Sequence, residues 1–485
     1  MGAATTQYAS NGSAQESLTK KPLKYLGFAL LLAWHYCLWF VPRAFFHVPL
    51  LDDSVTYAWL INLAATVCAL FVIAKLLGRK RHLSDYRWLY WAAPLLTGVA
   101  TLVFLVVPQA FSIRAITFSL PFFLGITEAV MWILWGERYA SIKANFSIKH
   151  IGMVFGLTLI STIAIASFLP PLVSSVFVAL LPLVSGALLL YVTKEQKTQK
   201  VTYPPLLPKN TAKEGFRNLI VVCIISFAAS TACYFLAAII PWEILPTTEE
   251  SFTVGIVGGA ILILAISTIC IAAANRINIF KLYPWLLVVE VIAFALFLAE
   301  TSYYFPSFIM ALAVSSVFEI FLIMYFGILT SKGYIPPVWA FSFSAGFIRA
   351  GILAGNSLAI FYELNPALAQ AITPETCLVF IAILLALLIA LVKQEYNIAA
   401  LTSEPLSGDD LKRICNEITK EFSLSERESE ILFLIASGRT ADSIAKKLVI
   451  SPHTANTHIR HIYEKTRIHK RSELLNYINM QRSDY

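Results

Sequence analysis

The sequence contains little charge. Only 14% of its 485 residues are Asp, Glu, Lys or Arg, 58% are hydrophobic, and the mean hydropathy is +0.71. Soluble domains carry about 25% charged residues, because charged side chains solvate the surface of a globular fold. This composition excludes an ordinary soluble protein and predicts a polytopic membrane protein.

Paired cysteines and catalytic motifs are also missing. The seven cysteines form no C-x-x-C pair and no cluster with histidines, and most lie singly within apolar segments. Isolated cysteines of this kind act as small hydrophobic residues, which argues against a disulfide framework or a metal site. The sequence contains no phosphate-binding glycine loop, no H-E-x-x-H motif and no nucleophile–base set. We therefore expect no enzyme activity, no catalytic residues, no metal and no cofactor.

Long apolar segments make up most of the chain, each able to cross about 30 Å of hydrocarbon as a helix. Between two of them stands Pro170-Pro171, where we expect a tight outer turn; a single long kinked helix is the alternative. A polar break at 194–216 divides the spans six and six, into halves 23–193 and 217–393. After an N-terminal tail at 1–22, the twelve expected spans are 23–46, 54–77, 87–107, 112–135, 150–170, 172–192, 217–241, 252–274, 282–301, 305–330, 337–361 and 375–393.

Lysine and arginine gather on one side of this predicted domain. If the spans alternate, the loops that contain Arg79-Lys80-Arg81, Arg138, Lys332 and the 194–216 break share a side, and acidic residues prevail on the other. Cytoplasmic loops of membrane proteins carry the excess of Lys and Arg. The pattern predicts a multi-pass protein of the cytoplasmic (inner) membrane with both termini in the cytoplasm.

The two predicted halves share a weak internal repeat. Glu128 in the fourth span is followed eight residues later by Gly136, and Glu319 in the tenth span is followed eight residues later by Gly327. With the six-plus-six division, the cytoplasmic termini and a basic Gly78-Arg79-Lys80-Arg81 loop, this pattern resembles the major facilitator superfamily. The resemblance implies two six-helix halves with a ligand site between them.

Ionisable residues within the predicted spans are candidates for that site. A charged side chain at the centre of a span costs about 2.5–3.5 kcal/mol even on insertion scales, so it needs a partner or water. Glu128, Glu319 and Arg349 either line a cavity that binds a small-molecule effector or pair only to hold helices together. We take them, with His35, as ligand-sensing candidates. For His35 the alternative is an aromatic interface anchor, and for Glu290 a structural role is favoured.

The composition becomes polar after Lys393. Residues 394–420 are expected to be a linker with one short helix around 409–420, and residues 421–485 contain four amphipathic helices. Ser425 and Glu428 form a capping box, and Ser451 before Pro452 starts the third helix. The predicted fold is all-α: a polytopic bundle of twelve helices followed by a four-helix domain.

A series of motifs runs through this C-terminal segment at helix-turn-helix spacing. The motifs are Ser425-Glu426-Arg427-Glu428-Ser429-Glu430-Ile431-Leu432, Gly438, Ser443-Ile444-Ala445-Lys446-Lys447-Leu448, Ile450-Ser451-Pro452-His453-Thr454-Ala455-Asn456-Thr457-His458, Ile462 and Lys465. Over about residues 421–482 they resemble the DNA-binding domain of LuxR-type regulators, also called the NarL/FixJ type. Asn456 stands where that family usually has Lys, which changes the surface that contacts DNA.

The resemblance implies that the helix starting at Ser451 enters the major groove. Its base contacts would come from Asn456, Thr457 and Arg460, with Arg460 binding guanine and Asn456 binding adenine through paired hydrogen bonds. Phosphate contacts are expected from Thr454, His458, Lys465, Arg467, Lys470 and Arg471.

The last predicted helix carries an apolar stripe, Leu474, Leu475 and Ile478. In the resembled family this helix forms the dimer contact, so we expect a homodimer that binds two half-sites; core packing against the first helix of the domain is the alternative.

Together these features predict a membrane-embedded one-component transcription regulator. Its partners would be double-stranded DNA, membrane lipid and a small-molecule effector. The alternative is a facilitator-type secondary transporter with a fused regulatory DNA-binding module.

Overall fold

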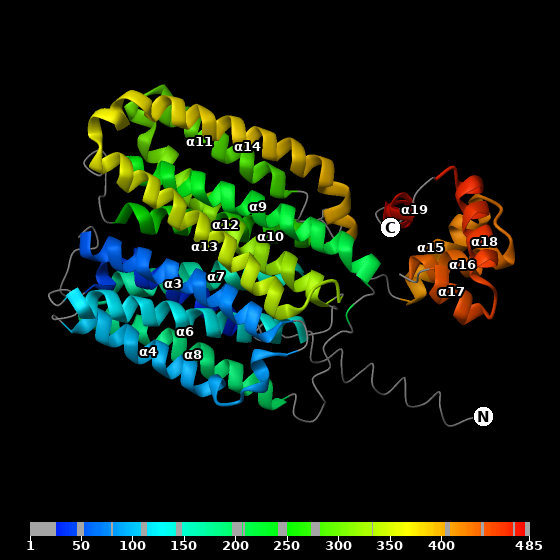
Figure 1. The fold of residues 1–485 in the computed structure, drawn as a ribbon, viewed down its shortest axis with the longest axis horizontal. Coiled ribbons are helices and arrows are strands. Elements are labelled where there is room, and N and C mark those ends of the chain that lie inside the picture. The colour runs from blue at the N-terminus through cyan, green and yellow to red at the C-terminus, as the bar shows by residue number, and fades with distance from the viewer. Residues whose placement is uncertain are drawn as a thin grey trace. The chain divides into compact units, whose positions relative to one another are not determined.

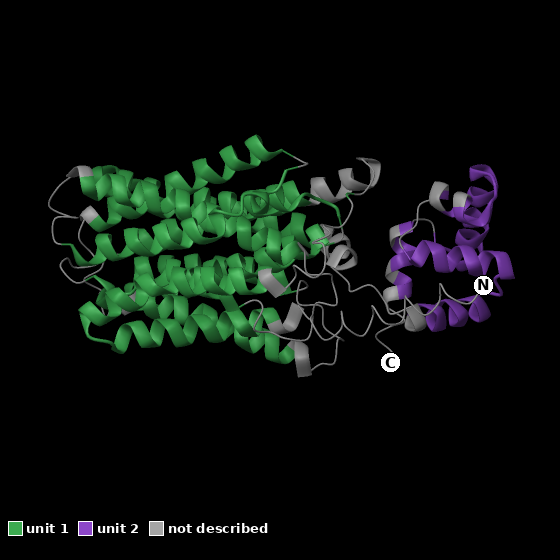
Figure 2. Cartoon of the chain, turned by 90° about the horizontal axis from the view of Figure 1, so that it is seen from below, with its two compact units in different colours: residues 1–272, 281–392 green, residues 273–280, 393–485 purple. Residues whose placement is uncertain are grey.

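The computed structural model describes residues 26–45, 53–78, 81–107, 114–141, 148–195, 206, 209–240, 250–272, 282–331, 333–402, 408–437, 441–468 and 471–480. The predicted tail at 1–22, Arg79-Lys80, most of the 194–216 break, Gly438 and Lys470 lie outside these residues. Contacts divide the chain into one compact unit of residues 1–272 and 281–392 and a second of residues 273–280 and 393–485 (Figure 2).

The first unit is a bundle of long apolar helices (Figure 1). In chain order they are α2 (Leu26–Phe40), α3 (Asp53–Leu77), α4 (Leu89–Val106), α6 (Arg114–Ser141), α7 (Ile148–Phe168), α8 (Pro171–Glu195), α9 (Lys209–Ile239), α10 (Glu250–Ala272), α11 (Tyr283–Ala299), α12 (Tyr304–Ser331), α13 (Pro337–Leu364) and α14 (Pro366–Thr402). Short 3-10 turns lie at Pro42–Ala44, Leu83–Asp85 and Thr301–Tyr303. The described residues contain no strand, which agrees with the all-α prediction.

Nine of the described helices are long and apolar enough to cross a membrane, and α2, α10 and α11 have shorter apolar stretches. A polytopic membrane domain is therefore confirmed, while the division into twelve spans arranged six and six stays a prediction. The expected turn at Pro170-Pro171 is present, because α7 ends at Phe168 and α8 begins at Pro171. Proline is well placed there, since it lacks the N–H that the first turn of a helix leaves unused.

Burial separates the inner helices from the outer ones. In α12, 89% of the most apolar window is buried within the protein, against 17% in α14, so α12 is central and α14 lies at the edge of the bundle. The closest packing joins α9 to α13, where Gly351 and Gly355 lie against backbone carbonyl oxygens of Phe227 and Thr231. A Cβ atom would collide with these carbonyls, so the two glycines let the helix axes approach, as small residues commonly do between membrane helices.

The second unit contains five described helices around its own hydrophobic core. They are α15 (Gly408–Glu421), α16 (Glu426–Ala436), α17 (Ala441–Leu448), α18 (Pro452–Thr466) and α19 (Arg471–Met480). The last four are the helices that the sequence predicts within 421–485, and α15 is the short helix expected around 409–420. Both predicted N-caps are present, because the Ser425 hydroxyl accepts the Glu428 N–H at 3.3 Å and the Ser451 hydroxyl accepts the Thr454 N–H at 3.0 Å.

Residues 394–420 contain the short helix that we expected around 409–420, and they are more helical than a linker. Helix α14 continues to Thr402, and α15 buries Leu411, Ile414, Cys415 and Ile418 in the core of the second unit. The spacing of these four residues is that of a single apolar helix face. Because α15 packs on α16, it is part of the folded unit as well as a connection to it.

Candidate functional site

Arg349 lies at the centre of a buried polar network in the membrane unit. Its Nε and Nη2 atoms donate to Glu128 Oε1 at 3.1 and 2.7 Å, and its Nη1 atom donates to Glu319 Oε1 at 3.0 Å. The three side chains come from α13, α6 and α12, and each is at most 5% exposed. Two carboxylates therefore share one guanidinium away from solvent. Removing one partner from a buried ion pair typically costs about 3–5 kcal/mol, because the remaining charge is uncompensated.

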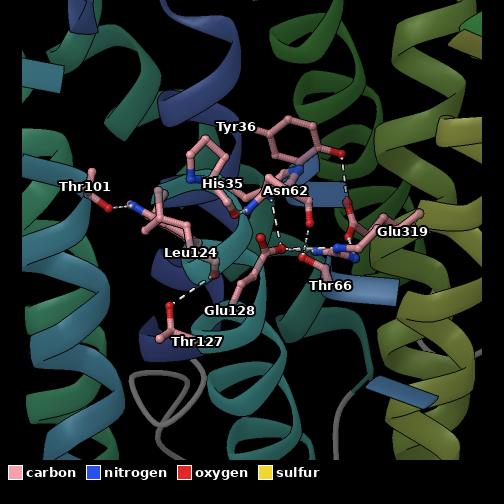
Figure 3. Close-up of polar contacts among 12 residues, drawn as sticks. His35, Tyr36, Asn62, Thr66, Thr101, Leu124, Thr127, Glu128 and Glu319 are labelled. Carbon is pink, nitrogen blue, oxygen red and sulfur yellow. Dashed lines mark hydrogen bonds and ion pairs between the residues drawn. The ribbon is translucent and has the colours of Figure 1, made fainter. Parts of the chain in front are cut away.

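Two side chains of α2 complete this network. His35 Nδ1 lies 3.1 Å from Glu128 Oε1, and the Tyr36 hydroxyl donates to Glu319 Oε2 at 3.0 Å. Figure 3 shows His35 and Tyr36 of α2 together with Glu128 of α6 and Glu319 of α12. We call His35, Tyr36, Glu128, Glu319 and Arg349 the central network. It contains all four side chains that the sequence singles out as ligand-sensing candidates.

Tyr36 was not among those candidates. The structure buries Tyr36 to 3% exposure, and its hydroxyl donates to Glu319. The signal that could have identified it is its hydroxyl group within an otherwise apolar span, since buried tyrosine hydroxyls need a partner.

One carboxylate oxygen of the central network lacks a donor. Glu128 Oε1 receives both Arg349 contacts and the His35 contact, but among the described residues nothing donates a hydrogen bond to the buried Glu128 Oε2. A buried acceptor without a donor costs about 1–3 kcal/mol. Glu128 Oε2 is therefore an acceptor that a ligand with an N–H donor could satisfy.

Glu290 lies apart from the central network. It is fully buried on α11 and lies against Cys233 of α9, and no ion pair to it is found among the described residues. For Glu290 the structural role stays a prediction.

The predicted base contacts lie on α18. The Asn456 side chain is exposed, that of Arg460 is 68% exposed, and the Thr457 hydroxyl donates to the His453 carbonyl oxygen at 3.0 Å. Arg460 Nε lies 3.6 Å from Glu464 Oε1, an exposed pair within one helix that solvent screens strongly. Asn456 and Arg460 are thus available on the outer face of the helix.

The predicted phosphate contacts are spread over α18 and its C-terminal end. Thr454 is exposed at the first turn of α18, His458 is partly exposed in its middle, and Arg467 is exposed just after its end in the left-handed conformation, with a φ of 55°. Arg471 is partly exposed at the start of α19. The phosphate contacts of these residues remain predictions.

Lys465 has a partner inside the domain. Its ammonium group donates to Glu428 Oε2 at 2.7 Å and to the Ser423 carbonyl oxygen at 3.3 Å, which ties the end of α18 to the start of α16. A phosphate contact by Lys465 would have to break this pair. The sequence could not show the pairing, because 37 residues separate Lys465 from Glu428.

The Lys465–Glu428 pair makes the second unit sensitive to acid. Burial would raise the pKa of the Glu428 carboxyl, but hydrogen bonds from Lys465 and Ser425 outweigh burial and leave this pKa below its ordinary value. A lowered pKa stabilises the fold above the unfolded value of about 4.3, and this stabilisation is lost as the pH falls through the folded value.

We expect Glu428→Gln to lower the free energy of unfolding of a purified segment 408–485 by about 1.5–3 kcal/mol at pH 7. The difference from the natural sequence should shrink below about pH 4, as chemical denaturation at a series of pH values would measure. Glu464→Gln, which changes an exposed carboxylate on α18, serves as the control and should change little. A difference that grows on acidification would contradict the assignment.

The apolar stripe of α19 contributes to the core of the second unit. Leu474 and Ile478 are buried within a single chain, at 0% and 2% exposure, and Leu475 packs partly buried against the same core. Because α19 contacts α16, the structure has the core packing that was the alternative for Leu474 and Ile478. Of the three residues, Leu475 keeps surface for the predicted dimer contact.

Comparison with known proteins identifies the class of the second unit. Residues 422–478 match the model of the family described as bacterial regulatory proteins, luxR family. The chain is 39% identical over 66 residues to the uncharacterized response regulatory protein YgeK of Escherichia coli strain K12. That match covers 14% of this chain and 45% of YgeK, so the chain spans less than half of that relative. The predicted resemblance to the LuxR-type DNA-binding domain is confirmed for this segment.

The membrane unit is similar to solved transporter structures. A bacterial homologue of the iron transporter ferroportin, in an outward-facing state with soaked iron, matches with a TM-score of 0.55 and 16% identity, covering 77% of this chain and 99% of that one. The major facilitator superfamily transporter FucP, in an outward conformation, matches with a TM-score of 0.47 and 12% identity, covering 77% and 97%. At this identity the first likeness shows a shared fold and nothing about the ligand. The chain thus joins a segment that matches the luxR family to a membrane domain that shares the fold of a bacterial ferroportin homologue.

Proposed function

We propose that this protein is a one-component transcription regulator that stays in the membrane while it binds DNA. The membrane unit would bind a small-molecule effector at the central network, and the effector would control sequence-specific DNA binding by α18. The observation that carries this proposal is Arg349, which joins Glu128 of the first predicted half to Glu319 of the second in a chain that ends in a luxR-family domain.

In this proposal, effector binding changes how the two predicted halves of the membrane unit pack against each other, and this change is the signal. In the described conformation the central network is closed, since each of its side chains is buried. An effector that contacts these carboxylates differently in an open conformation shifts the equilibrium by its difference in affinity for the two states. Helix α14 continues to Thr402, shortly before α15 begins at Gly408, so the stiff end of the last predicted span is where movement would pass along the chain.

The proposed membrane location, orientation and assembly of the protein follow from the charge pattern and the domain order. Both termini would lie in the cytoplasm and the membrane unit would span the inner membrane. Two copies would pair through their C-terminal domains and bind the half-sites of one operator. The proposed domains are a tail (1–22), a membrane sensor (23–393), a connecting segment (394–420) and a DNA-binding domain (421–485), and α15 belongs with the last in structure.

A facilitator-type secondary transporter with a fused regulatory module is the second candidate. The likeness of the membrane unit to a bacterial homologue of an iron transporter supports it. In a transporter the central network would be a substrate site, and uptake into vesicles that contain the purified chain would depend on Glu128, Glu319 and Arg349. A receptor binds the same ligand without net flux.

The regulator is tested in cells that express the full-length chain. Crosslinking and sequencing should recover discrete chromosomal sites from the membrane-bound protein, and transcripts beside those sites should change when candidate small molecules are added. The control is Asn456→Ala with Arg460→Ala, which should stay in the membrane and lose the sites. If the vesicles take up molecules that change no transcript beside the recovered sites, the regulator is rejected in favour of the transporter.

A further inference from the structure

The charges of the central network do not balance. Two carboxylates, Glu128 and Glu319, face one guanidinium, Arg349, in a place closed to solvent. The further titratable group on Glu128 is His35, which is positive only when protonated. An isolated buried charge is strongly unfavourable. With a neutral His35 the network carries one surplus negative charge, which favours a cationic ligand.

The unsatisfied oxygen shows where such a cation would bind. Glu128 Oε2 is buried, and no described residue donates to it. Glu319 is occupied on both oxygens, by Arg349 and by Tyr36. A ligand that brings an N–H donor and a positive charge would satisfy Glu128 Oε2 and the charge balance at once.

A row of aromatic rings, which we call the aromatic wall, begins at Tyr36 of the central network. The ring centroids of Tyr36 and Phe40 are 5.9 Å apart, those of Phe40 and Trp59 5.3 Å, and those of Trp59 and Tyr234 5.8 Å. The wall thus runs from the network through α2 and α3 to α9, and the Trp132 ring already holds the Arg349 guanidinium, 4.6 Å from its centroid. The faces of aromatic rings attract cations and also accept apolar groups.

These features exclude other ligand classes in turn. An anion would add to the surplus negative charge, and a neutral molecule would leave it uncompensated. A metal ion lacks a prepared site, because the described residues contain no group of three or more His, Cys, Asp or Glu side chains that could hold one. A cation with an apolar body fits both the carboxylate and the aromatic wall.

We propose that the effector of the membrane unit is an organic cation, a protonated amine whose ammonium group hydrogen-bonds to Glu128 Oε2 and whose apolar body lies against the aromatic wall. This inference rests on the proposed function, because it names the ligand class of the proposed effector site.

Three probes that differ mainly in charge test the proposal on the full-length chain in detergent. They are benzylamine, benzyl alcohol and benzoate, each at millimolar concentration. We expect benzylamine to raise the midpoint of thermal unfolding by about 2 °C or more and the other two to leave it unchanged. Equal stabilisation by benzyl alcohol or benzoate would overturn the proposal, and so would the absence of any shift with benzylamine. This comparison requires no variant.

Two variants locate the shift. Glu128→Gln should remove it, whereas Glu290→Gln, a matched change of a buried carboxylate outside the network, should keep it. A benzylamine shift that persists in a folded Glu128→Gln chain would place the amine elsewhere and reject the site.

The outcome separates this inference from the regulator itself. Amine binding at Glu128 with unchanged occupancy of chromosomal sites would leave the ligand class standing and remove the regulatory function. A transcript response to an anion or a neutral molecule alone would support the regulatory function and reject the organic cation as its ligand.

Discussion

Replacing Arg349 by Met is expected to destabilise the membrane unit by about 3–5 kcal/mol. The variant removes the only guanidinium that contacts Glu128 and Glu319 among the described residues and leaves two buried carboxylates facing each other. The midpoint of thermal unfolding of the full-length chain in detergent, followed by size-exclusion chromatography after heating, measures the loss. Lys75→Met, which removes an exposed cation near the end of α3, is the control and should have little effect.

A rescue experiment shows whether charge is the cause. Glu128→Gln and Glu319→Gln in the Arg349→Met background should recover much of the stability, because amides carry no charge to compensate. Lysine in place of Arg349, with both glutamates kept, should recover less of the stability than the two Glu→Gln changes do. A single ammonium group cannot reproduce a planar fork with separate N–H groups on each carboxylate. If neutralising the two acids lowers stability further, the charge imbalance is not what Arg349 relieves.

Replacing Arg460 by Ala is expected to lower sequence-specific DNA binding strongly and leave membrane insertion intact. A paired contact to one base contributes about 1–3 kcal/mol of discrimination, which is roughly tenfold to hundredfold in affinity. The preferred duplex would first be selected from a random pool with the natural full-length chain. Affinity for that duplex and for a scrambled one, measured at one salt concentration, then gives the specificity ratio.

The choice of control separates base contact from general charge. Arg427→Ala removes a cation from α16, where Arg427 pairs with Glu430 and donates to the Leu448 carbonyl oxygen. It should lower the affinity for the preferred and scrambled duplexes to the same extent, if at all. A specificity ratio that is unchanged in Arg460→Ala would remove Arg460 from the base contacts.

Local patterns in the sequence identified most elements of both units. Apolar runs located the membrane helices, since a span needs about twenty apolar residues whatever its neighbours are. Caps at Ser425 and Ser451 located the starts of two helices of the DNA-binding domain, because a cap is a contact between residues three positions apart. The sequence located the short helix α15 within 394–420 but not its role, because its buried residues complete the core from outside the segment that carries the family pattern.

The sequence identified the candidate residues of the membrane site individually, but it did not show how they are arranged. A charge within a span is conspicuous because it is costly there, so Glu128, Glu319 and Arg349 stood out. Whether they meet depends on how α6, α12 and α13 pack, and Arg349 is 221 residues from Glu128. Tyr36 became part of the site only through its contact with Glu319 in the folded chain.

The sequence by itself determined that this protein is helical, embedded in a membrane and equipped with a LuxR-type DNA-binding segment, because hydropathy, capping and helical periodicity are properties of neighbouring residues. Only the tertiary structure decided that Lys465 is bound to Glu428, that Leu474 and Ile478 belong to a core, and that one arginine serves two carboxylates. The physical reason is that these partners lie far apart along the chain, and a distance between two side chains exists only once the helices that carry them have packed.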